Sequence, residues 1–178
     1  MEDKYSQITL RLVSASLDRG EVARLCVTSN SMYPMIRKGD YVLIRTVDLN
    51  NLPFGAIVVF RRDVELITHR LIKVDSATVL TKGDNNSLPD PPINKALILG
   101  EVVQIERDNK KLSLERSRSR FVATFVGGAN LISAKLNLTC DAIWTKLFKH
   151  RLEKVRFWVM HMLSFPMKMI CRAALFFV

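Results

Sequence analysis

The sequence predicts a mainly β fold: a compact, partly closed β-domain of short strands, followed by an amphipathic helical appendage at the C-terminus. Between residues 24 and 106, short runs rich in Val, Ile and Leu alternate with turn-forming Gly, Pro, Asp and Asn, a spacing typical of small β-domains. From about residue 121 the composition changes to Phe, Leu, Met, Trp, Lys and Arg. The net charge of +10 lies entirely in residues 107–178, with 14 basic and 4 acidic residues, because residues 1–106 carry 13 of each.

The elements can be assigned in order along the chain. Residues 4–18 predict a short helix because Ile8, Leu12 and Leu17 form a rough apolar stripe, although alternation over residues 8–12 also fits a strand. Strands are predicted at 24–28, 41–47, 56–61, 65–74, 77–82 and 97–106. The resulting domains are an N-terminal segment 1–20, a β-domain 21–107, a polar basic connector 108–120 and a basic helical region 121–178.

The C-terminal region is predicted to be a basic amphipathic helix. Ile143, Leu147, Arg151 and Val155 recur every four residues, and Trp144, Phe148, Leu152 and Val159 fill an adjacent stripe. Charged residues interrupt every long apolar run, so we expect this helix to lie in the plane of an anionic membrane and not to cross it. A docking surface for a partner protein is the alternative, and the many apolar positions argue against nucleic acid.

Localisation is predicted from the N-terminus and the cysteines. The acidic start of the chain lacks a secretory signal, which favours a monotopic protein on the cytoplasmic face of a membrane. Cys26, Cys140 and Cys171 are odd in number and show no zinc spacing, so we expect free thiols, a reducing compartment and no metal or other cofactor.

Three segments carry the residue types of nucleophilic catalysis. Ser31 lies in the turn Ser-Asn-Ser-Met-Tyr-Pro (residues 29–34), where its hydroxyl would face solvent beside free backbone N–H groups. His69 follows, and then come two aspartates, Asp84 and Asp90. A neutral histidine can accept the serine proton and return it to the leaving amine, while a carboxylate on its other nitrogen stabilises the imidazolium. Serine, histidine and aspartate in this order therefore predict a hydrolase.

These motifs resemble the type I signal peptidases, and among them the Ser-His branch represented by the catalytic subunit of the endoplasmic-reticulum complex and its archaeal and some bacterial relatives. The resemblance covers about residues 22–106. It implies that Ser31 is the nucleophile and that the Ser29 hydroxyl helps to bind the oxyanion. It also implies that His69 is the base, where most bacterial enzymes carry lysine, and that Asp90 completes the triad.

The third motif departs from the family at one position. The family's Lys-Gly-Asp-Asn-Asn-x-x-Asp-Asp segment matches residues 82–90, and Asp90 falls on the second of the paired aspartates. Pro89 stands where the family has the first, which reduces the local negative charge. Asp84 remains an alternative orienting carboxylate, although a Gly-Asp-Asn sequence also suits a turn residue that bonds its own backbone.

The resemblance further implies a peptide or preprotein substrate that binds as an extended strand, with small side chains in shallow apolar pockets. We expect Ile36, Val42, Ile57 and Val58 to form the pocket walls. The predicted function is a membrane-associated serine endopeptidase that cleaves signal or leader peptides after small residues. The alternatives are a self-cleaving repressor-type regulator, which shares the serine turn but uses a lysine base, and a non-catalytic membrane adaptor with the same fold.

Overall fold

The computed structural model describes the backbone of residues 2–115 and 117–148, and four further helical positions at Val155, Val159, Met162 and Met169. Side chains are described for residues 6–115 and 122–146 and for these four. Of the predicted amphipathic stripes, the side chains of Leu147, Phe148, Arg151 and Leu152 lie outside the described residues.

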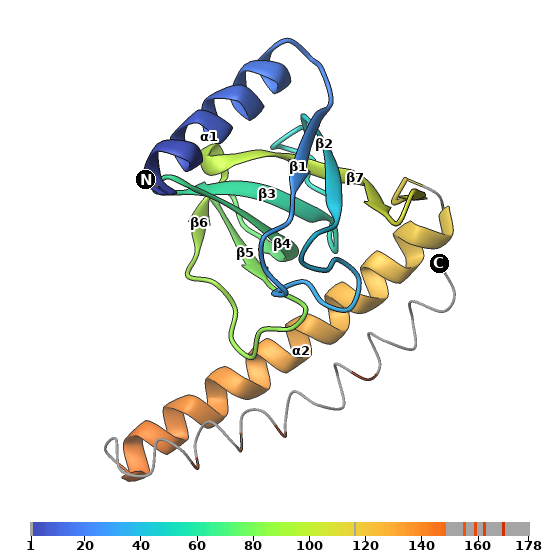
Figure 1. Cartoon of the computed structure of the whole chain (residues 1–178). Coiled ribbons are helices and arrows are strands. Elements are labelled where there is room, and N and C mark those ends of the chain that lie inside the picture. The colour runs from blue at the N-terminus through green and yellow to red at the C-terminus, as the bar shows by residue number, and fades with distance from the viewer. Residues whose placement is uncertain are drawn as a thin grey trace.

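The β-domain is one antiparallel sheet of eight strands, which confirms the predicted mainly β fold (Figure 1). The strand order is β1-β2-β7-β3-β4-β5-β6, and β8 also pairs with β7. The six predicted strands are present with small shifts at their ends, whereas β6 and β8 were not predicted. The strands are β1 Ala23–Cys26, β2 Tyr41–Arg45, β3 Ile57–Arg62, β4 Glu65–Val74, β5 Thr78–Lys82, β6 Ile93–Asn94, β7 Ile98–Arg107 and β8 Lys110–Ser113.

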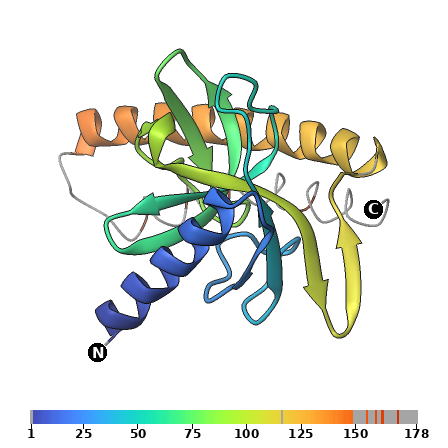
Figure 2. The same cartoon turned by 90° about the horizontal axis from the view of Figure 1, so that it is seen from above.

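Two helices flank the sheet, and a short 3-10 helix, η1 Lys95–Leu97, precedes β7. Helix α1 spans Glu2–Asp18 and α2 spans Ser117–Phe148. The two lie on opposite sides of the β-domain in Figure 1, and Figure 2, seen from above, shows α2 running across behind the strands. Among the described residues, no helix combines the length and the apolar character that a membrane span requires.

Strand β8 lies inside the segment predicted as a basic connector. Asp108 and Asn109 both have positive φ angles, 49° and 61°, and together they form a two-residue hairpin turn between β7 and β8. The residues that follow, Lys110–Ser113, are polar and lack a clear alternation, so composition alone favoured a linker. The connector is therefore shorter than predicted, because the hairpin occupies its first half.

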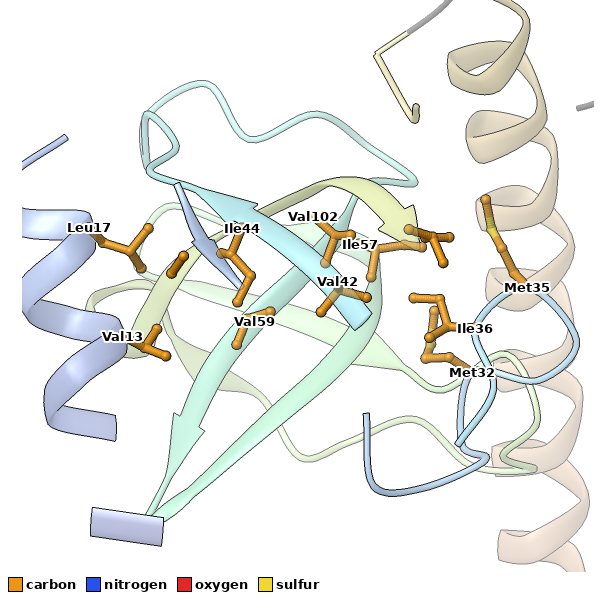
Figure 3. Packing of buried hydrophobic residues seen from close by; sticks show 12 residues of the cluster. Val13, Leu17, Met32, Met35, Ile36, Val42, Ile44, Ile57, Val59 and Val102 are labelled. Atoms are coloured by element: carbon orange, nitrogen blue, oxygen red, sulfur yellow. The ribbon is translucent and has the colours of Figure 1, made fainter. Parts of the chain in front are cut away.

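The core lies on both faces of the sheet. Along β3, Ile57 and Val59 join one cluster of buried residues, while Val58 and Phe60 join the other. Successive strand residues point to opposite faces, so four consecutive apolar residues mark a strand covered on both sides. Figure 3 shows the first cluster extending from α1 to the loop that carries Met32.

Helix α2 packs on the β-domain by direct backbone contact. A Cβ atom on Gly55 would lie 2.3 Å from the carbonyl oxygen of Ala123, and one on Gly127 would lie 2.9 Å from the Cα of Gly55. Only glycine permits so close an approach. The buried face of α2 then continues with polar residues as well as apolar ones: Val122, Val126, Ala129, Asn130, Ser133, Ala134 and Asn137.

Candidate active site

The loop between β1 and β2 carries Ser31 and is closed at its base. The Val27 N–H donates to the Asp40 carbonyl at 2.9 Å, and the Gly39 N–H donates to the Val27 carbonyl at 2.8 Å. The buried Asp40 carboxylate accepts two hydrogen bonds from Arg107 at 2.6 and 2.9 Å and one from the Arg37 N–H at 2.8 Å. Burial raises the pKa of Asp40, but these bonds outweigh it and hold the pKa below its ordinary value. The Gly-Asp turn therefore anchors the serine loop to β7.

Ser29 and Ser31 lie side by side within this loop. Their hydroxyl oxygens are 3.2 Å apart, and the Ser31 N–H donates to the Ser29 Oγ at 3.5 Å. A hydroxyl and a backbone N–H thus gather next to the Ser31 Oγ. Backbone N–H groups and hydroxyls are donors of the kind from which oxyanion holes are built.

His69 is held on β4 by one carboxylate. Its Nδ1 lies 2.6 Å from the Oδ2 of Asp90, and the imidazole meets the Phe60 ring in a T-shaped arrangement at a centroid distance of 6.2 Å. The His69 side chain is 7% exposed and the Asp90 side chain 8%. With Nδ1 bonded to Asp90, the other ring nitrogen is the one left to exchange a proton with a substrate or a serine.

Two residues that sequence reasoning missed hold Asp90 in place. The Thr81 hydroxyl donates to its Oδ2 at 2.7 Å, and Arg62 donates to its Oδ1 at 2.8 Å. Burial raises the pKa of Asp90, but the hydrogen bonds from His69, Arg62 and Thr81 outweigh it and keep the pKa below its ordinary value. Arg62 stands in none of the three motifs, and Thr81 directly precedes the matched segment of residues 82–90.

Asp84, the alternative carboxylate, contacts a different partner. It accepts two hydrogen bonds from the Arg70 guanidinium at 2.6 and 2.8 Å, and both side chains are fully buried. The Asn130 amide of α2 donates to it at 2.7 Å. Of the two aspartates, Asp90 is therefore the one that contacts His69.

The segment that begins at Gly83 lies directly against the serine turn. The Asn85 N–H donates to the Ser31 carbonyl at 2.8 Å, and the Asn85 amide donates to the Asn30 carbonyl at 3.2 Å. A Cβ on Gly83 would lie 2.7 Å from the Ser31 carbonyl oxygen, so a larger residue would push the two segments apart. The loop that supplies Asp90 therefore also positions the backbone of Ser31.

A cleft of about 780 Å³ contains Ser29, Ser31 and His69. Its walls are the edge of β1 on one side and the first half of β4 on the other, and α1 contributes Ser6 and Thr9. Its apolar lining comes from side chains of these two strands and of the serine loop: Leu25, Val27, Met32, Ile36, Leu66 and Ile67.

Of the four residues expected in the pocket walls, Ile36 lines this cleft. Val42, Ile57 and Val58 are buried in the core of the sheet, where they are at most 3% exposed, and do not line it. Within the described ranges, no group of three or more His, Cys, Asp and Glu side chains is placed to hold a metal ion.

Comparison with known proteins places the chain in a family. A family model described as Peptidase S24-like matches residues 2–103, more than half of the chain. The signal peptidase complex catalytic subunit SEC11C of Homo sapiens, Mus musculus and Canis lupus familiaris is 38% identical to this chain over 77 residues. The match covers 39% of this chain and 40% of each relative, so the chain spans about two fifths of the length of these curated relatives. From the extent of the family match, the chain belongs to the Peptidase S24-like family, and over part of its length it is similar to signal peptidase complex catalytic subunits.

Proposed function

We propose that this protein is a serine endopeptidase that cleaves signal or leader peptides after small residues. The observation that carries the proposal is the Nδ1 contact of His69 with Asp90, at 2.6 Å, in the same cleft as Ser31. Similarity to proteins named as signal peptidase complex catalytic subunits supports the substrate class.

In this mechanism His69 accepts the proton of the Ser31 hydroxyl through its free ring nitrogen as the Ser31 Oγ attacks the scissile carbonyl. The Ser31 N–H and the Ser29 hydroxyl stabilise the oxyanion. The tetrahedral intermediate collapses, the C–N bond breaks, and His69 returns the proton to the leaving amine. Water, deprotonated by His69, then hydrolyses the acyl-enzyme. The Ser31 hydroxyl bonds Ser29 in this structure, so we expect it to turn toward His69 when substrate fills the cleft.

The substrate would bind as an added strand between β1 and β4. In the described sheet, β1 pairs only with β2, and residues 65–69 of β4 pair only with β3, so both have a free edge. Since each neighbouring pair of strands is antiparallel, β1 and β4 run in the same sense, and a peptide could bond both edges. From Glu65 to His69 an extended chain advances about 13 Å, so this edge has room for about four substrate residues.

The pocket beside Ser31 suits small side chains. Met32 and Ile36 close its floor and are themselves 1% and 0% exposed, so they pack tightly on the core. A bulky substrate side chain would have to displace them, at a cost typical of overpacking.

The C-terminal region would hold the protein on an anionic membrane without crossing it. On α2, Phe125, Ile132, Leu136 and Ile143 are each about half exposed and fall on one helical stripe. The basic excess of residues 107–178 supplies attraction to anionic lipid. A helix that lies in the plane of a membrane combines burial of its apolar stripe with attraction of its basic residues to anionic lipid.

Peptide cleavage tests the catalytic proposal. The purified chain is incubated with a peptide library, the cut sites are mapped by mass spectrometry, and Ser31→Ala serves as the control. We expect cuts after small residues in the wild type, and a loss of about 10⁶-fold in rate for Ser31→Ala. Cuts made equally by Ser31→Ala would refute the assignment of the nucleophile.

Vesicle flotation tests the membrane proposal. The chain of residues 1–178 is compared with a chain lacking residues 141–178 and with Ile132→Ser/Leu136→Ser, on vesicles with and without phosphatidylserine. We expect the 1–178 chain to float with anionic vesicles and to be released only in part by salt, and we expect both variants to bind less. Cleavage of short soluble peptides should stay unchanged. Equal binding of the double variant would point to a protein partner on this stripe.

A further inference from the structure

We propose that α2 is part of the catalytic apparatus, with Asn130 and Asn137 as positioning residues for the loop of residues 83–90. The inference rests on the proposed function, since it concerns the same site. It extends that function to a helix outside the 2–103 region matched by the family model.

Asn130 joins three elements at the start of this loop. Its side chain is buried, its amide donates to the Asp84 carboxylate at 2.7 Å, and its carbonyl accepts from the Lys82 ammonium at 2.8 Å. Asp84 is held in turn by Arg70 of β4. Both ends of the Asn130 amide are thus used, and the network connects α2 with β4 and with the end of β5.

Asn137 contacts the same loop from two helical turns further along α2. Its side chain is fully buried, and its amide donates to the Ser87 carbonyl at 2.7 Å. Residues seven apart lie on the same face of a helix, so the two asparagines hold the loop at its beginning and at its middle.

The held loop contacts the reacting groups on both sides. Between the two anchor points, Asn85 donates its N–H to the Ser31 carbonyl. Beyond the second, Asp90 contacts His69. A shift of this loop would therefore displace the Ser31 backbone and the Asp90 carboxylate together, and small displacements of catalytic groups are costly in rate.

The choice of residue on α2 supports a role other than packing. Asparagine is a poor helix former, and a leucine at either position would bury more apolar surface. A buried amide contributes only when its hydrogen bonds are made. At each position one hydrogen bond of the amide goes to the loop of the active site, to Asp84 from Asn130 and to Ser87 from Asn137. These bonds fix the position of the loop relative to the helix.

Covalent labelling of Ser31 by a fluorophosphonate probe tests the inference. Labelling rate constant and final stoichiometry are measured for wild type, Asn130→Ala and Asn137→Ala, with Thr139→Ala as the control. Thr139 is exposed on the same helix, and its hydroxyl donates to the Lys135 carbonyl one turn back. We expect the rate constant to fall about 10- to 100-fold in both asparagine variants, with full stoichiometry, and to stay within about twofold for Thr139→Ala. For peptide cleavage, kcat should fall while KM is unchanged.

The outcomes separate positioning from stability. A lower stoichiometry with a wild-type rate constant would mean that the asparagines only stabilise the fold, and it would overturn the proposal. Asn130→Asp is the second variant, should Asn130→Ala not fold. It preserves size and the acceptor for Lys82, but it sets a carboxylate against Asp84, so its rate constant should also fall. A wild type that reacts no faster than Ser31→Ala would overturn the proposed function, whereas equal rates in wild type and both variants would overturn this inference alone.

Discussion

His69 and Arg70 are neighbours on β4, and each binds one aspartate of the same loop. His69 contacts Asp90 at the wall of the cleft, and Arg70 contacts Asp84 beneath α2. Because successive strand residues point to opposite faces, one step along β4 separates the two pairs. The first pair is 7% and 8% exposed, the second 0% and 1%.

The two pairs differ in what their base can do. The guanidinium of Arg70 stays protonated at every accessible pH, so its pair with Asp84 can only hold structure. Histidine is the residue type that most often serves as a general base, so the pair of His69 with Asp90 has the composition of a proton-transfer site. The same loop therefore supplies a carboxylate to the fixed Arg70 ion pair on one face of β4 and another to His69 on the other face.

The largest difference between the pairs should appear in the Asp90→Asn variant. Removal of the carboxylate leaves His69 without the partner that fixes its tautomer, so the rate should fall by about 10⁴-fold. The fold should persist, which circular dichroism checks alongside peptide cleavage. Near-normal turnover in Asp90→Asn would remove Asp90 from the catalytic group.

Asp84→Asn should instead lower stability strongly and activity much less. It leaves the buried Arg70 charge without its carboxylate, and breaking a buried pair in this way costs about 3–5 kcal/mol of unfolding free energy. Urea unfolding measures the loss. The folded fraction of Asp84→Asn should retain much more activity than Asp90→Asn. An Asp84→Asn protein that is stable but inactive would mean that Asp84, and not Asp90, is the catalytic carboxylate.

Ser29→Ala probes the cleft side without touching either pair. If the Ser29 hydroxyl donates to the oxyanion, kcat should fall by about 10²-fold, with an unchanged midpoint of thermal unfolding. Since the hydroxyl lies 3.2 Å from the Ser31 Oγ, substitution could also alter the reach of the nucleophile. Ser29→Cys, which retains a weak donor, serves as the matched variant, and its kcat should lie between those of the wild type and Ser29→Ala.

The smallest expected effect is on stability in acid. The pKa of Asp90 is lower in the folded protein than its ordinary value, so the ionised carboxylate favours folding. This contribution is complete above about pH 4 and is lost as the pH falls through the lowered value. Denaturant unfolding between pH 6 and pH 2 should show a steeper loss for wild type than for Asp90→Asn. Parallel curves would indicate that Asp90 has the same pKa in both states.

The sequence motifs predicted Ser31, His69 and the two candidate aspartates, because serine turns and Gly-Asp-Asn segments have recognisable local chemistry. The choice between Asp84 and Asp90 depends on which face of β4 each meets, which is a matter of distance. Residues 69 and 70 are adjacent in a predicted strand, so their side chains must face opposite ways. This pattern indicates that His69 and Arg70 bind different aspartates.

Pocket walls and helix contacts were harder to predict for physical reasons. Val42, Ile57 and Val58 have the composition of any buried strand residue, and a sheet covered on both faces gives no alternation to separate core from cleft. Asn130 and Asn137 lie in a helix whose apolar and basic pattern dominates the sequence. Their seven-residue spacing on a buried face was the available signal.

The backbone contact between Gly55 and Gly127 has a geometric consequence. Side chains can rotate, but two backbones in contact leave a helix little freedom to roll about its axis. The exposed stripe of α2 and the mouth of the cleft therefore keep a constant mutual orientation. A protein bound to a surface by that stripe would hold its cleft at one fixed angle and one fixed distance from the surface. In Gly127→Ala, the added Cβ would push the two backbones apart, and the helix could then rotate relative to the cleft.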